Sequence, residues 1–374
     1  MPRIRTLARN AGFSIIELMI AIVLGALVVA GLVNVLIANR QAYHLQEANN
    51  YNQQNMRFAM DRIGWSLRMA DFFGGAPAVD ITGAPVIPAG AGNCNAAWAL
   101  AVTQPVYGYD GSAGMPADLA GCINAANYVN GADILILRYA DTDALEAAAV
   151  PIPGKVYLQV QTGGHGVLFV TTPPASPAVG TPGVSTYPYA VEMFYLRPCS
   201  DPGAGGICSA GSDGGNPIPT LMRLRLDDTG TLINEPVVEG IEQLQFEYGV
   251  RDPLNPNAIV PEKYKSATAM TANDWTNVIA VRVGYVLRAQ TRDVGQPHIF
   301  DSNSTDPAVA AFPSRLSNDC EYAVDTAGTV TIAPGTCANF SPASVGNAKN
   351  PAQQFARIEM TSVVQLRNLV RAKP

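Results

Sequence analysis

The longest apolar run in the chain is GFSIIELMIAIVLGALVVAGLVNVLIA, residues 12–38. At about 1.5 Å per residue, residues 13–38 reach roughly 39 Å as a helix, which exceeds the hydrocarbon core of a bilayer, about 30 Å. A basic leader precedes the run, with arginines at Arg3, Arg5 and Arg9. No charge lies between Leu18 and Asn39. Because basic flanks stay in the cytoplasm, we expect a cytoplasmic N-terminus and an exported remainder.

One carboxylate, Glu17, interrupts the apolar run near its start. A charge at the centre of a membrane helix costs roughly 2.5–3.5 kcal/mol and less near an end. The dipole at a helix N-terminus recovers only a fraction of that cost. A simple anchor explains the length and the arginines but leaves Glu17 unexplained. A secretory signal would also be shorter and would end in a small-residue cleavage site. Glu17 therefore predicts a partner of opposite charge.

The residues at the start of the run resemble the class III signal of type IV pilins and pseudopilins. The matching stretch is Gly12-Phe13-Ser14-Ile15-Ile16-Glu17-Leu18-Met19. The resemblance implies that a membrane-embedded prepilin peptidase cuts between Gly12 and Phe13 and methylates the new N-terminus, Phe13. It also implies that Glu17 pairs with the N-terminal amine of a neighbouring subunit, which would compensate a carboxylate buried in a polymer.

Composition favours an exported domain rich in β-structure. Charged residues make up 14% of the chain, against roughly 25% in an average soluble domain. The net charge is −6, and loss of the three leader arginines takes it to −9. A net negative charge argues against non-specific electrostatic binding to nucleic acid, so no nucleic-acid partner is expected.

The cysteines also indicate export. There are six, at Cys94, Cys122, Cys199, Cys208, Cys320 and Cys337. An even count in an exported chain favours disulfides, although many connectivities are possible. Pairing of neighbours in sequence is the simplest proposal. Zinc is the competing interpretation, but no Cys-x-x-Cys occurs and the three histidines are scattered.

Beyond the apolar run, residues 39–73 continue a helical pattern of a different character. Apolar or small side chains recur at three- and four-residue steps, at Leu45, Ala48, Asn52, Met56, Ala59, Ile63, Leu67 and Ala70. A second row runs beside them, at Phe58, Arg62, Trp65, Met69 and Phe72. We interpret both rows as core packing. One helix is therefore expected from Phe13 to about Phe72, ended by Gly74 and Gly75.

Strand patterns dominate the rest of the chain. Strands are predicted at 97–101, 133–139, 156–161, 167–171, 190–197, 221–227, 243–251, 279–287 and 358–366. The strand at 243–251 alternates apolar and polar residues and is expected to be wet on one face. Long loops rich in Gly and Pro fill 74–121, tied by a Cys94–Cys122 bridge, and 198–219, while 291–354 holds Cys320 and Cys337.

Several blocks of this region are similar to PilW-type minor pilins of Gram-negative bacteria. They are residues 55–61, 67–70, 131–133, 239–242, 248–250, 274–275, 281–283 and 364–369. The long stretch 74–121 has no match to that pattern. The resemblance implies an α+β, type IV pilin-like fold in which a long N-terminal helix packs on an antiparallel β-sheet domain with disulfide-tied loops. The expected parts are a leader at 1–12, a membrane or filament-core helix at 13–38, an amphipathic half at 39–73 and a β-rich domain at 74–374.

The same resemblance implies a function. The chain would sit in the inner membrane as a single-pass protein with a cytoplasmic N-terminus, and then enter the pilus on the cell surface. Its partners would be other minor pilins, the major pilin and the prepilin peptidase and N-methyltransferase. It would help to prime pilus assembly and so support twitching motility and attachment.

Other function classes remain as alternatives. A minor pseudopilin of type II secretion would share the N-terminal features. A pilus-tip adhesin would use the loops at 74–121 and 291–354 to bind a surface ligand. No phosphate-binding loop and no His-Glu-x-x-His motif occurs, so neither an enzyme nor a cofactor is expected. Acidic turns at 141–146 and 227–230 could gather oxygens around calcium, but their spacing is not that of an EF-hand, and no metal is expected.

Overall fold

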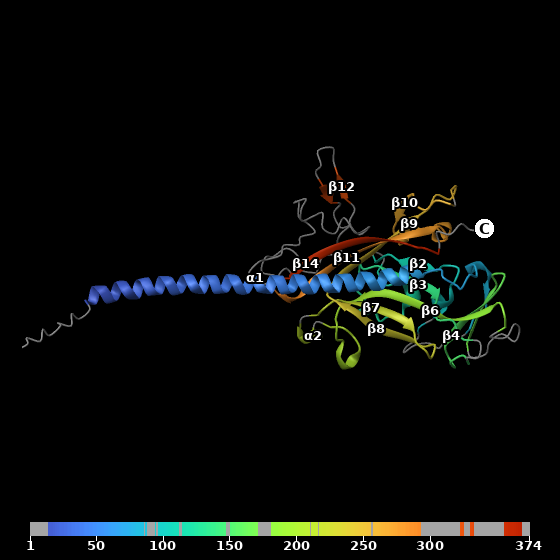
Figure 1. Cartoon of the computed structure of the whole chain (residues 1–374), viewed down its shortest axis with the longest axis horizontal. Coiled ribbons are helices and arrows are strands. Elements are labelled where there is room, and N and C mark those ends of the chain that lie inside the picture. The colour runs from blue at the N-terminus through green and yellow to red at the C-terminus, as the bar shows by residue number, and fades with distance from the viewer. Residues whose placement is uncertain are drawn as a thin grey trace, which may run out of the picture.

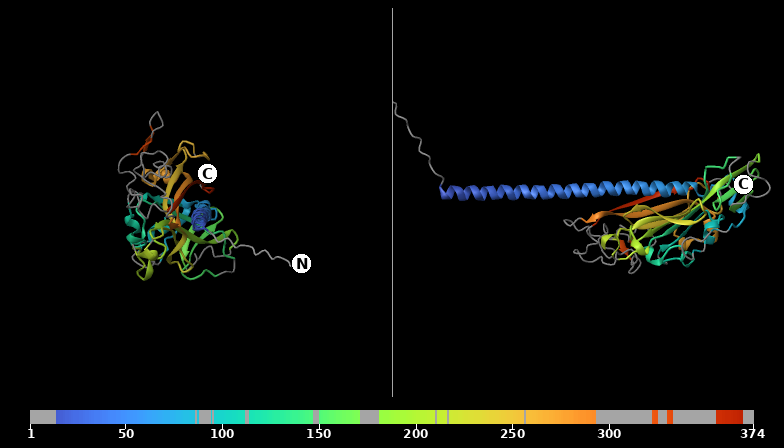
Figure 2. Two further views of the ribbon diagram at one scale, coloured as in Figure 1. Left: turned by 90° about the vertical axis from the view of Figure 1, so that its left-hand side faces the viewer. Right: turned by 90° about the horizontal axis from the view of Figure 1, so that it is seen from below.

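A single helix, α1 (Ile15–Met69), organises the structure. The structure is a computed structural model that describes residues 14–85, 87, 94, 96–111, 114–146, 150–170, 181–209, 211–215, 217–255, 257–292, 322–324, 330–332 and 355–368. The first part of α1 projects away from the rest of the molecule, and its second part lies along a β-rich domain (Figures 1 and 2). The expected long helix is therefore present as one element.

The end of α1 differs from the expectation that it would reach Phe72. Ala70 leaves the helix with φ −50° and ψ 140°, and Asp71 has φ 65°. The chain turns here because Asp71 and Phe72 join the neighbouring sheet: Asp71 N–H donates to Arg138 O at 3.2 Å, and Ala140 N–H donates to Phe72 O at 2.6 Å. Gly74, with φ 63°, belongs to the turn that follows and not to the helix end.

The larger sheet has eight strands in the order β1-β5-β4-β6-β3-β2, with β7 paired to β6 and β8 paired to β7. Its pairs are antiparallel except for the parallel β1–β5 pair. The strands are β1 (Ile81–Thr82), β2 (Val106–Tyr109), β3 (Ile134–Ala140), β4 (Val156–Gln161), β5 (Gly166–Val170), β6 (Val184–Arg197), β7 (Thr220–Leu226) and β8 (Leu232–Glu239).

A second, antiparallel sheet has the order β10-β9-β11-β14. Its strands are β9 (Ile241–Val250), β10 (Lys263–Lys265), β11 (Val278–Arg292) and β14 (Phe355–Gln365), and β12 (Tyr322–Val324) pairs separately with β13 (Val330–Ile332). Short helical turns connect these strands: α2 (Ser212–Gly215), α3 (Ala272–Trp275), η1 (Ala78–Asp80), η2 (Ala96–Leu100), η4 (Ala117–Leu119), η5 (Ala125–Asn127), η6 (Gly203–Gly205) and η7 (Ala267–Ala269).

The core lies on both faces of the larger sheet. Leu135 and Leu137 of β3 join α1 and the second sheet in one apolar cluster. Ile134 and Ile136, which point to the opposite face, join a second cluster beneath the loops that follow α1. This two-sided burial explains why β3 reads as a continuous apolar run.

Two strand predictions are wrong. Residues 96–100 form the 3₁₀ turn η2 and not a strand. The strand β9 is not wet on one face, because Gln243 and Gln245 are 3% and 1% exposed. Both side-chain amides donate to Gly131 O, at 3.3 and 2.7 Å, so hydrogen bonds replace the water that the polar pattern implied.

Asp133 joins the two sheets at this point. Its Oδ1 accepts the Gly111 N–H at 2.8 Å, and its Oδ2 accepts the Phe246 N–H of β9 at 2.7 Å. The carboxylate thereby satisfies backbone donors from two different segments. The block at 131–133 thus acts as a buried link between the sheets.

Candidate functional site

The projecting part of α1 is an uncovered apolar surface. Residues 14–44 are all exposed, and large side chains such as Leu27 and Leu32 are each 64% exposed. The mean hydropathy of its most apolar 18-residue window is 2.8, so the helix is long and apolar enough to cross a membrane by length and composition. In water such a surface is unfavourable, since burying a Leu or Val side chain is worth about 1.5–3 kcal/mol.

Glu17 lies in the first turn of this surface. The Ser14 N–H donates to Glu17 Oε2 at 3.4 Å, and the carboxylate is otherwise exposed. No basic residue occurs between Glu17 and Arg40 in the sequence. The helix thus presents one negative charge on an apolar surface. Gly12, Phe13 and the leader arginines lie outside the described residues.

The second part of α1 is docked onto the domain through one face. Met56 is 8% exposed, and Ala59, Ile63, Leu67 and Ala70 are fully buried. Their three- and four-residue spacing confirms the first predicted row from Met56 to Ala70. All of them belong to the cluster that includes both sheets. The docked face is therefore part of the core of the domain.

A buried carboxylate clamps the same part of α1 to the larger sheet. Glu192 of β6, with a side chain 4% exposed, pairs with Arg62 at 2.5 Å and with Arg223 at 2.8 Å. It also accepts a hydrogen bond from the hydroxyl of Ser66. Burial, followed by the nearby charge of Glu192, raises the pKa of Tyr139 well above its usual value. Two positive charges and a hydroxyl thus compensate one buried negative charge.

The second predicted row is not core packing along its whole length. Phe58 is 57% exposed and Trp65 is 41% exposed. Trp65 meets Tyr139 edge-on, with 5.8 Å between ring centroids, and Arg62 lies 5.3 Å from its ring. The domain reaches only one stripe of the helix, so these rings stay at the surface beside it.

The C-terminal end of α1 is capped from the far end of the chain. Asn368 Nδ2 donates to the carbonyls of Arg68, Met69 and Ala70 at 3.2, 3.4 and 3.0 Å. The last carbonyls of a helix lack hydrogen-bond donors within the helix, and the Asn368 amide serves as their donor. The sequence block at 364–369 gave no indication of this role.

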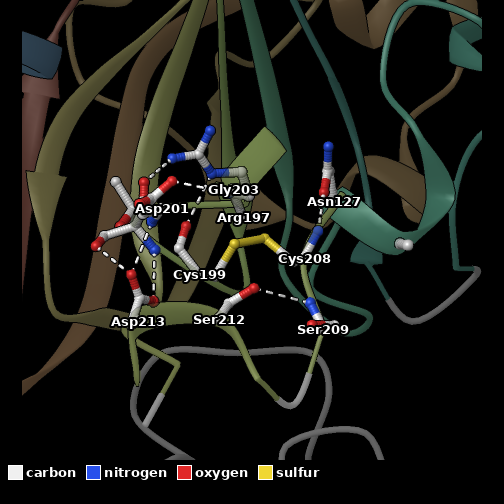
Figure 3. Close-up of a disulfide and its surroundings, with 12 residues drawn as sticks. Asn127, Arg197, Cys199, Asp201, Gly203, Cys208, Ser209, Ser212 and Asp213 are labelled. Atoms are coloured by element: carbon white, nitrogen blue, oxygen red, sulfur yellow. Dashed lines mark hydrogen bonds between the residues drawn. A yellow bond between two sulfur atoms is a disulfide. The ribbon is translucent and has the colours of Figure 1, made fainter. Parts of the chain in front are cut away.

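Two disulfides tie loops in the described part of the domain. Cys94 pairs with Cys122, and Cys199 pairs with Cys208, as expected from sequence order. Figure 3 shows the second bridge beside Asp213, whose carboxylate accepts hydrogen bonds from Ser200, Asp201 and Ile218. Burial acts to raise the pKa of Asp213, but these bonds hold it below its usual value.

The other positions that the sequence singled out are two further cysteines, an acidic turn and a histidine. Cys320 and Cys337 lie outside the described residues. The carboxylate of Asp227 accepts bonds from Thr229 and Thr231, and so shapes the turn between β7 and β8. His165 lies in the turn between β4 and β5. Within the described part of the chain, no three His, Cys, Asp or Glu side chains gather as a metal site would need.

Two family models match the chain. The prokaryotic N-terminal methylation motif matches residues 7–33, which include the start of the exposed helix. Type IV pilus-assembly protein W matches residues 208–368, from the second disulfide to the residue that caps α1. No curated protein and no solved structure matches the chain.

These matches fit the geometry of the helix. A methylation motif at the head of an exposed apolar helix that continues into a β-rich domain defines a pilin-like protein. Residues 208–368 match a PilW domain, and together with the methylation motif this match supports a minor pilin related to the type IV pilus. The matched motif implies processing by prepilin peptidase and assembly with other pilus components.

Proposed function

We propose that the chain packs its helix into the core of the type IV pilus and helps to prime assembly with other minor pilins and the major pilin. Through that role it supports twitching motility and attachment. The leader, residues 1–12, is removed after Gly12, and Phe13 is methylated. Before assembly, residues 13–38 span the inner membrane with the N-terminus in the cytoplasm, residues 39–73 link the span to the domain, and residues 74–374 lie outside.

The observation that carries this proposal is the uncovered apolar part of α1 with Glu17 at its start. Either lipid or neighbouring helices would cover the apolar side chains, so these alone support only an anchor. Glu17 favours the polymer, because a neighbour's N-terminal amine at Phe13 would compensate its charge. In lipid the charge of Glu17 has no such partner, so transfer of the helix from the bilayer to the filament is favourable for this carboxylate.

The exposed rings of the docked part extend the same argument. Phe58 and Trp65 lie on a face of α1 that the domain does not cover. Aromatic side chains are enriched at protein interfaces, since they bury a large area with few rotatable bonds. We assign them to contacts with adjacent subunits of the filament.

Processing is tested by Gly12→Val. A bulky residue at the cleavage position should leave the leader attached, which intact mass measurement of the membrane-extracted protein detects. A chain of mature mass that still enters filaments would show that Gly12 is not the cleavage position.

Assembly is tested by Glu17→Val, with Asn34→Val as the matched control. Asn34 is a polar but uncharged residue of the same exposed run. Glu17→Val should be cleaved normally but lost from sheared filaments, while Asn34→Val should be cleaved and incorporated. Equal incorporation of both variants would contradict the pairing of Glu17 with an amine.

The choice between pilus and secretion is tested by deleting the gene. Loss of surface pili and of twitching, with secretion intact and restored by the wild-type chain, supports the proposal. Loss of type II secretion with normal pili would replace it with the pseudopilin function.

A further inference from the structure

A pocket of about 360 Å³ opens on the domain. It is lined on one side by β2 and the segment that follows β2, and on the other side by η7, the 3₁₀ turn that follows β10. The lining side chains used below are Tyr107, Tyr109, Asp110, Met115, Asp118 and Thr268. Its volume is within the range of small-ligand sites.

Two glycines fix the backbone beneath this pocket. A Cβ at Gly108 would lie 1.8 Å from the Tyr248 hydroxyl oxygen, and one at Gly111 would lie 2.4 Å from Ala132 O. The hydroxyl of Tyr248 is buried and has no hydrogen-bond partner among the described residues. Only glycine allows so close an approach, so β2 is held in one position against the second sheet.

Aromatic rings form a supported wall. Tyr107 and Tyr109 meet edge-on with 5.3 Å between their centroids, and Trp275 lies 4.6 Å behind Tyr107. Trp275 in turn contacts Tyr248 at 4.7 Å. This packing limits the movement of the Tyr107 ring, and Met115 adds a flexible apolar contact.

The polar side chains that line the pocket offer hydrogen-bond acceptors, because two of the hydroxyls among them donate to carboxylates of the same lining. Tyr109 donates its hydroxyl to Asp118 Oδ2 at 3.3 Å, and Thr268 donates to Asp110 Oδ2 at 2.8 Å. Burial and then the charge of Asp118 raise the pKa of Tyr109 to about 12, so its hydroxyl stays protonated. The exposed carboxylate of Asp118 can accept further bonds, whereas the hydroxyl proton of Tyr109 is committed to it.

The charge of the pocket is negative. None of the described lining residues is basic. Two basic side chains of neighbouring elements are directed elsewhere: Lys265 pairs with Asp274 at 2.6 Å, and Arg138 donates to the carbonyls of Trp98 and Gln104. A ligand that brings donors and positive charge is therefore suited to this pocket.

We propose that this pocket binds an alkylammonium group. The ammonium has three donors and no acceptor, which suits the exposed carboxylate of Asp118, and its carbon chain suits the rings and Met115. A neutral polyol can also donate hydrogen bonds to a carboxylate, but it fits less well because it brings no positive charge. A lysine side chain of another protein and a free amine share this chemistry.

The test titrates the full chain in detergent micelles and follows binding by calorimetry. The probes are Nα-acetyl-lysine methylamide and its uncharged Nε-acetyl analogue. The charged probe should bind saturably and at least about tenfold more tightly than the neutral analogue, and added salt should weaken it. Absence of saturable binding, or equal binding of both probes, overturns the proposal.

Two variants locate the site. Asp118→Asn should weaken the charged probe at least about tenfold, whereas Asp80→Asn, an exposed carboxylate in η1 outside the pocket lining, should leave binding unchanged. Asp118 is exposed, so the variant should keep the thermal midpoint of the parent chain. Unchanged binding in Asp118→Asn, or equal loss in both variants, overturns the assignment.

The two sources are separated by comparing cadaverine with a lysine-containing peptide. Tighter binding of the peptide points to a protein side chain, and tighter binding of cadaverine points to a free amine. Both results support an ammonium site.

Discussion

The two parts of α1 are one helix with two different surroundings. Residues 14–44 are exposed on every side, whereas the part from Asn52 to Ala70 buries one face in the domain. Both parts are regular helix, so the difference lies in what covers them. The docked part finds its partners within its own chain, and the projecting part does not. A chain built in this way separates domain stability from assembly.

The largest effect should come from removing the buried clamp. Glu192→Ala leaves Arg62 and Arg223 without their shared carboxylate, and we expect a loss of about 3–5 kcal/mol in the free energy of unfolding. Urea unfolding of the full chain in detergent, followed by near-UV circular dichroism, measures this. Glu235→Ala, at a side chain 30% exposed, is the matched control and should cost less. Equal losses would mean that burial of the clamp is unimportant.

A matched pair of leucines tests the comparison directly. Leu67 is fully buried in the docked part, and Leu27 is 64% exposed in the projecting part. Leu67→Ala should lower the free energy of unfolding by about 3 kcal/mol through lost burial and a cavity. Leu27→Ala should leave the domain unchanged within about 0.5 kcal/mol. A similar loss in both variants would show that the two parts unfold together.

Acid should weaken the domain while sparing the projecting helix. Burial acts to raise the pKa of Asp274, but bonds from Lys265 and Thr271 lower it to about 2. Because the folded pKa lies below the unfolded one, the stabilisation is present above about pH 4 and is lost as the pH falls toward 2, a change of about 1–2 kcal/mol. Urea unfolding at pH 5 and pH 2.5 measures the loss.

Asp274→Asn is the control for this acid effect. It should be less stable at pH 5 and should lose less on acidification than the parent chain. The same acid loss in the variant would assign the effect to other carboxylates.

The smallest effect should come from the cap of α1. Asn368→Ala removes the donor to three carbonyls and should cost about 1 kcal/mol. Gln365→Ala, which removes a single exposed bond to Ile259 O, should cost less. A lower thermal midpoint for Asn368→Ala than for Gln365→Ala would show that the cap helps to hold the docked part of α1 on the domain. Equal midpoints would remove it from them.

Local periodicity predicted the elements that bury a regular face. The spacing of Ile63, Leu67 and Ala70 indicated the docked face correctly, and the apolar run at 133–139 indicated β3. The strand β8 escaped notice because it lies at the edge of its sheet, pairing only with β7, and carries Pro236. Proline is tolerated at such an edge, where its missing N–H would face solvent. Sequence period therefore finds central elements more readily than edges.

Long-range polar contacts could not be predicted. Glu192 meets Ser66 across 126 residues of sequence, and Asn368 meets Arg68 across 300. Neither residue stands out by its neighbours, since the partner that gives it a role is supplied by the fold. Glu17 could be singled out because its context, a lone charge in an apolar run, is local.

The cap on α1 also sets an order of events in the making of the protein. The carbonyls at residues 68–70 are synthesised early, yet their donor is residue 368. Contacts between such distant residues close late, because a long loop must first be ordered. During synthesis the end of α1 therefore stays without this cap until nearly the whole chain has emerged. A chain that stops before residue 368 would leave the carbonyls of residues 68–70 without this donor.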